Sequence, residues 1–196
     1  MTSPTGARGV FAFALRAIAF GVVLFALWYL AARPISFAVA WGAAQIVQGA
    51  APVENASAQS SAAGQVSIAA GLEGMEIEIP VDPRKQTFGL PFFLALLLAS
   101  RPPRIARRAA LGAAILLGLA ACGVASEVAI SLGTLAGPSG APLVRFGTLA
   151  ATSWALGFQL GTLIIPTAVP AMLWVAMDPR ALHAASRRLR SNLISA

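Results

Sequence analysis

The residues of this 196-residue chain that could carry covalent chemistry are few and far apart. The chain has a single cysteine, Cys122, and a single histidine, His183. A thiol nucleophile needs its histidine within hydrogen-bonding distance, yet Cys122 lies in an apolar segment and His183 in a basic tail. The sequence also contains no phosphate-binding loop, dinucleotide fingerprint or HExxH motif. We therefore predict no catalytic, cofactor-binding or metal-binding residues, and no enzymatic activity.

Acidic side chains form one local group. Glu76, Glu78 and Asp82 lie within seven positions of one another, and Glu73 precedes Glu76 by three positions. Divalent cations favour carboxylate oxygens, but these residues lack the regular ligand spacing of a metal-binding loop. We interpret the group as a solvated strand face, with an acidic docking surface as the functional alternative.

Glu127 is the acidic residue that lies inside or next to a long apolar run. Ionisable residues within membrane segments commonly mark ion or proton pathways. A structural alternative is a pairing with Arg145 across the following turn. We keep Glu127 as a possible intramembrane acid.

The last apolar run combines small residues with prolines. Ser153, Gly157 and Gly161 recur every four residues, a spacing that lets helix backbones approach closely. The face that they form could pack within the chain or contact another protein. Pro166 and Pro170 predict a kink further along the same run.

These side chains must be positioned by membrane helices, because the composition is unlike that of a soluble domain. Hydrophobic residues make up 58% of the chain and charged residues 11%, and several runs approach the roughly 20 residues that cross a bilayer. The net charge is +7, but the arginines gather at the ends of the apolar runs. This pattern is typical of membrane topology, so we expect membrane lipids as partners and no nucleic acid. The fold class predicted is an all-α polytopic membrane protein with a small β-hairpin.

Four transmembrane helices are predicted, the first of them an uncleaved anchor. Nine arginines fall in the N-terminal tail, the loop between the second and third helices, and the C-terminal tail, whereas four basic residues fall on the other side. The excess of basic residues predicts that both termini are cytoplasmic, in a multi-pass protein of the bacterial inner membrane. The predicted helices span 10–32, 88–100, 109–135 and 146–176, and the connecting segments are 1–9, 33–87, 101–108, 136–145 and 177–196.

The segment 33–87 carries the predicted extracytoplasmic structure. Arg33-Pro34 is expected to bend or end the first helix, and residues 35–48 read as an interfacial helix or a continuation of the first span. Residues 49–64 are small and polar, which predicts a loop. Apolar and polar residues then alternate in 65–69 and 75–79, so we predict a β-hairpin within 65–80.

Two stretches resemble the exosortase H-associated membrane proteins. One is Phe25 to Pro34 (FALWYLAARP); the other is Asp82-Pro83 followed by Gly89-Leu90-Pro91 and the apolar residues 95–99. The resemblance implies a polar extracytoplasmic loop that leads into an apolar helix. It also implies a non-enzymatic accessory of an exosortase, a membrane-embedded protease that processes substrates with a C-terminal sorting signal.

Three functional hypotheses remain at this point. The first is an accessory or scaffold protein of an exosortase-type sorting system, with a membrane-protein partner. The second is a structural subunit of another envelope assembly, such as a secretion or conjugation machine. The third is a small transporter that uses Glu127.

Overall fold

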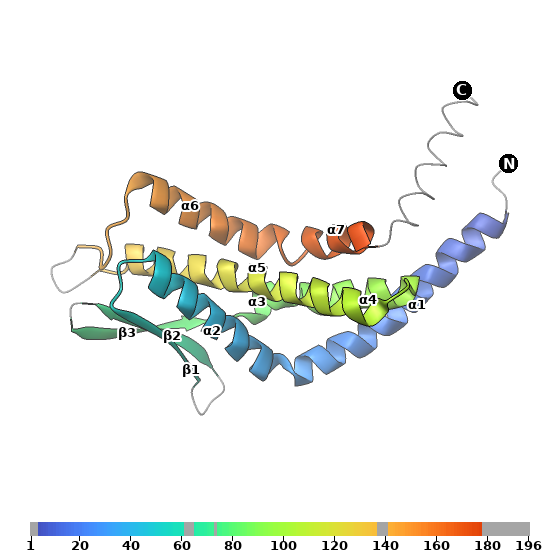
Figure 1. The fold of residues 1–196 in the computed structure, drawn as a ribbon, viewed down its shortest axis with the longest axis horizontal. Coiled ribbons are helices and arrows are strands. Elements are labelled where there is room, and N and C mark those ends of the chain that lie inside the picture. Colours follow the sequence, from blue (N-terminus) through green and yellow to red (C-terminus); the bar gives the residue numbers. More distant parts are fainter. Residues whose placement is uncertain (1–3, 61–64, 73, 137–140, 178–196) are drawn as a thin grey trace, which may run out of the picture.

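The computed structural model describes residues 4–60, 65–72, 74–136 and 141–177 (Figure 1). It is mostly helical, with one small three-stranded sheet. The sheet lies at one end of the long axis, whereas the start of the first helix, the link at 101–104 and the end of the last helix lie toward the other end. The residues of the predicted C-terminal tail from 178 onward, including His183, lie outside the described residues.

The first two helices meet at a break of one residue. Helix α1 spans Pro4–Leu30 and α2 spans Ala32–Ala50, with Ala31 between them. The sequence predicted a break near Arg33-Pro34, and the structure has it just before these residues. A proline is tolerated in the first turn of a helix, where its missing N–H leaves no hydrogen bond unmade, so α2 can begin there. The alanine and valine face of α2 is buried in the main core. It packs there with residues of the sheet and of the long helix that follows the sheet, so α2 is part of the packed fold and not only a helix on the membrane surface.

The predicted hairpin is present as part of a larger sheet. Strands β2 (Val66–Leu72) and β3 (Met75–Val81) pair antiparallel, and Gly74 adopts a φ of 78° in the turn. Strand β1 (Asn55–Ser60) pairs antiparallel with β2, so the strand order is β1-β2-β3. The prediction of a loop over 49–64 was therefore wrong for residues 55–60, and for 49–50, which belong to α2. Strand β1 has no β-branched residues, and its pairing with β2 imposes its extended conformation.

The strand register separates an apolar face from a polar face. Ile68 lies opposite Ile79, and both are buried in the main core with α2. On the other face Ala69 lies between Ser57 and Glu78. Successive side chains of a strand point to opposite faces, so the sheet lays its apolar face on the helices and presents a polar outer face.

A short turn of helix leads from the sheet into the next apolar segment. Helix α3 (Arg84–Thr87) precedes α4 (Gly89–Ser100), and α5 spans Ile105–Thr134. Arg101 and Arg104, on either side of two prolines, adopt left-handed backbone conformations with φ of 50° and 55°. These two residues reverse the chain between α4 and α5 within four positions, at a cost of about 1–2 kcal/mol each.

The last apolar run is bent as its prolines predicted. Helix α6 (Thr148–Gln159) continues into a π-helical turn, η1 (Leu160–Ile164), and α7 (Ala168–Met177) follows. The two parts meet at 72°. Pro166 lies between them, where a missing backbone donor breaks the helical hydrogen-bond ladder.

Among the described residues, two helices are long and apolar enough to cross a membrane, Gly9–Leu30 and Ile105–Thr134. The bent pair of α6–η1 and α7 makes a third if it forms one span. Helix α4, the predicted second span, has 12 residues. At about 1.5 Å per residue it is shorter than a bilayer core.

Candidate functional site

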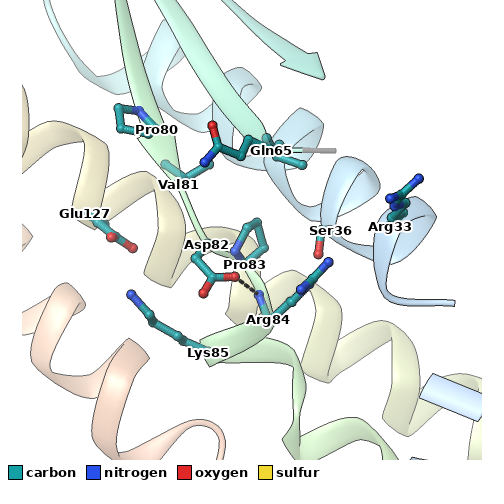
Figure 2. Close-up of a pocket in the computed structure, with 11 residues that line it drawn as sticks. Arg33, Ser36, Gln65, Pro80, Val81, Asp82, Pro83, Arg84, Lys85 and Glu127 are labelled. Atoms are coloured by element: carbon teal, nitrogen blue, oxygen red, sulfur yellow. Dashed lines mark hydrogen bonds between the residues drawn. The ribbon is translucent and has the colours of Figure 1, made fainter. Parts of the chain in front are cut away.

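A polar cavity of about 430 Å³ lies where the sheet meets the helices (Figure 2). It is open between the first turns of α2, the end of β3, α3 and the C-terminal half of α5. Its lining is rich in charged and polar side chains: Arg33, Ser36, Gln65, Val66, Pro80, Val81, Asp82, Pro83, Arg84, Lys85 and Glu127.

Local backbone structure fixes the side chains on one wall. Strand β3 ends at Val81, and Asp82-Pro83 turn the chain into α3. The backbone N–H of Arg84 donates to Asp82 Oδ1 at 3.3 Å, which closes this turn. The turn projects Arg84 and Lys85 toward the cavity from adjacent positions.

Basic and acidic side chains share the cavity without pairing. Arg33, Arg84 and Lys85 face it together with Asp82 and Glu127. No ion pair joins any of these five side chains to another of the described residues. In Figure 2 Arg33 and Arg84 lie on the side of Ser36, while Lys85 extends toward Glu127. The positive charge is therefore concentrated on the side of α2.

Ser36 stands out because its hydroxyl is buried and unsatisfied. The residue is 4% exposed, and its Oγ has no hydrogen-bond partner. In Figure 2 this oxygen points from α2 toward the Arg84 side chain. Burying a hydroxyl without a partner costs about 1–3 kcal/mol. A hydrogen-bond partner for Ser36 Oγ in the cavity would therefore be stabilising.

Glu127 is held by a residue that the sequence analysis did not single out. Gln86 Nε2 donates to Glu127 Oε2 at 3.2 Å, and Gln86 itself is 2% exposed. The predicted pairing of Glu127 with Arg145 is not formed; Arg145 is exposed and borders a different, apolar cavity between α5 and α6. No sequence pattern connects Gln86 with Glu127, which lies 41 positions away, so this hydrogen bond could not be predicted from the sequence.

The acidic group predicted outside the membrane divides into two places. Asp82 lines the polar cavity, whereas Glu76 and Glu78 lie on the outer face of β3. Glu76 accepts a hydrogen bond from Gln59 of β1, and Glu78 accepts one from Ser67 of β2. In the part of the chain that the structure describes, no group of three or more potential ligand residues is arranged to hold a metal ion.

The small residues of the last apolar run face inward, apart from the first. A Cβ added to Gly161 would lie 2.7 Å from Gly123 Cα of α5, and one added to Gly157 would overlap Ser126 Oγ. Ser153 is exposed and bonds to the carbonyl of Leu149 in its own helix. Gly157 and Gly161 thus bring α6 and η1 against α5 within the chain. Cys122, on the same α5, is exposed.

Comparison with known proteins identifies a family. The family model described as exosortase H-associated membrane protein matches residues 8–181, which is most of the chain. No curated protein and no solved structure matches.

Proposed function

Because this chain belongs to the exosortase H-associated membrane protein family, we propose that it is a non-enzymatic accessory subunit of an exosortase-type protein-sorting system. The family match carries the proposal, since residues 8–181 include the sheet and the described helices from residue 8 onward. In this role the chain binds the protease in the bacterial inner membrane and presents a surface for it or its substrate. The chemistry itself belongs to the partner.

The proposed topology has four passes, with both termini in the cytoplasm and the sheet outside. Its support is the excess of arginines in the segments predicted to be cytoplasmic, of which the start of α1 and the 101–104 link lie at one end of the described structure, and the position of the sheet at the other end (Figure 1). Helix α4 then crosses with help from α3, whose Arg84 and Lys85 reach the headgroup level.

Membrane-impermeant thiol labelling tests this topology. In a Cys122→Ala background, a cysteine at Ser57 should react in intact spheroplasts. A cysteine at Ala106, exposed in the first turn of α5 and within the predicted 101–108 loop, should react only after permeabilisation. The reverse pattern would invert the orientation.

We place the partner contact on the outer face of the sheet. This face carries the polar side chains of Ser57, Gln59, Glu76 and Glu78. It lies at the end of the molecule opposite to the arginine-containing link at 101–104. The inward direction of Gly157 and Gly161 leaves that glycine pair to packing within the chain. An acidic face favours a basic patch on the partner, because complementary charges raise the rate and specificity of association.

Co-purification with the exosortase encoded in the same cell tests the proposal. Tagged wild-type protein, extracted in mild detergent, should recover the protease, and Glu76→Lys/Glu78→Lys should reduce that recovery by about tenfold or more. Arg145→Glu reverses an exposed charge near the same end and should leave recovery unchanged. Removal of the whole hairpin would be uninformative, because Ile68 and Ile79 belong to the core. Recovery of the wild-type chain without any exosortase would refute the accessory role.

A further inference from the structure

We propose that the polar cavity binds the phosphate group of a membrane lipid. This inference concerns a ligand rather than the protein partner, and it stands apart from the accessory role. The phosphate would lie between Arg33, Arg84 and Ser36, with the glycerol and acyl chains extending toward the exposed surface of α1.

The charges of the cavity favour an anion on one side. The guanidinium groups of Arg33 and Arg84 come from two separate elements and have no ion-pair partner among the described residues. Arginine presents several N–H donors in a planar fork that matches phosphate oxygens. The two carboxylates are otherwise engaged: Asp82 accepts from a backbone N–H, and Glu127 accepts from Gln86. Glu127 also lies across the cavity from Arg33 (Figure 2).

Ser36 provides the second, independent observation. Its hydroxyl is buried, lines the cavity and lacks a hydrogen-bond partner. A phosphate oxygen beside Arg84 would accept the missing hydrogen bond. Buried polar groups are nearly always satisfied by protein, water or ligand, so this orphan hydroxyl marks where a ligand oxygen would lie.

The place of the cavity along the membrane helices favours a lipid as the source of the phosphate. Arg33 follows the end of the apolar span Gly9–Leu30 by three residues, and none of the residues in that span is buried. Lys85 precedes the apolar helix α4 by four residues. In the proposed topology, where α4 crosses the membrane, both ends of the cavity are thus at the level where headgroups lie. A volume of about 430 Å³ is in the range of small-ligand pockets.

Native mass spectrometry of the full-length chain in mild detergent tests the proposal with three probes. Dioleoylphosphatidylglycerol supplies phosphate and acyl chains, dioleoylglycerol supplies the chains alone, and inorganic phosphate supplies the anion alone. We expect phosphatidylglycerol to bind about tenfold or more tightly than dioleoylglycerol, because charge-assisted hydrogen bonds are strong. Millimolar inorganic phosphate should compete only weakly.

The variants separate this site from general attraction to basic surfaces. Arg33→Gln/Arg84→Gln should abolish the preference for phosphatidylglycerol, while Arg145→Gln should keep it. Ser36→Ala should weaken phosphatidylglycerol binding several-fold while leaving the lipid-free protein at least as stable, since the variant removes an unsatisfied hydroxyl.

Three results would overturn the inference. These are equal binding of the two lipids, an equal loss of binding in the Arg145 variant, and full competition by inorganic phosphate at the concentration of the lipid. The last of these would instead assign the cavity to a soluble phosphate.

Discussion

Helices α1 and α5 are nearly equal in hydropathy and opposite in environment. The most apolar 18-residue stretch has a mean hydropathy of 2.4 in α1 and 2.1 in α5. In α1 none of this stretch is buried, whereas in α5 44% of it is buried. Hydropathy therefore predicts that both can enter the bilayer. It does not predict which helix forms the centre of the fold.

Small residues on α5 account for the difference. Gly112, Gly123 and Ser126 are buried against Phe93, Gly161 and Gly157 of three neighbouring elements. In a membrane, helices associate through close van der Waals packing more than through exclusion of water. Helix α1 instead exposes large side chains such as Phe11, Ile18 and Val22, which suit lipid or a protein partner.

The largest effect is expected where two backbones touch. A Cβ at Gly123 would lie 3.1 Å from Gly161 Cα, and backbone atoms cannot move aside cheaply. Gly123→Val should therefore lower stability by about 3 kcal/mol or abolish folding. Gly118→Val, on the same helix with nothing near its Cβ, is the matched control. Thermal unfolding in detergent measures both, and equal behaviour of the two variants would refute the packing account.

A smaller loss is expected at the contact between α5 and α4. A Cβ at Gly112 would overlap the ring of Phe93, which is fully buried. Gly112→Ala should cost about 1–3 kcal/mol. Phe93→Leu removes the far end of the ring, so the double variant should recover part of the loss. A strictly additive double variant would mean that the two residues do not share the strain.

Glu127→Gln should have little effect on the fold or on partner recovery. A glutamine oxygen can still accept the hydrogen bond from Gln86, so we expect a change of less than about 1 kcal/mol. Co-purification and thermal unfolding of the variant measure this. Loss of cellular function with both measurements unchanged would favour a transport role instead.

The smallest effect is expected on the exposed face of α1. Ile18 is 65% exposed, and Ile18→Ala should change stability by no more than about 0.5 kcal/mol. The same thermal unfolding assay applies. A loss as large as that of Gly112→Ala would contradict the exposure of Ile18, because the unfolding assay would then report a packed side chain.

Local patterns predicted much of this fold, and contacts between separate segments account for what was missed. Apolar and polar residues alternate in 75–79, and this predicted β3 because successive residues of a strand face the core and the solvent in turn. Strand β1 has no strand pattern of its own and depends on pairing with the neighbouring strand β2, and the bond from Gln86 to Glu127 joins residues 41 positions apart. The polar cavity is also non-local, because the break at Ala31 and the turn at Asp82-Pro83 bring Arg33, Ser36 and Arg84 together.

Site-specific photo-cross-linking would test most directly whether the outer face of the sheet, and not α1, contacts the protease. Benzoylphenylalanine would be placed at Ser57 on the outer face or at Ile18 on α1, and cross-linked products would be identified in intact cells. We predict a product with the exosortase from Ser57. A product from Ile18 with none from Ser57 would contradict the account and move the contact into the membrane.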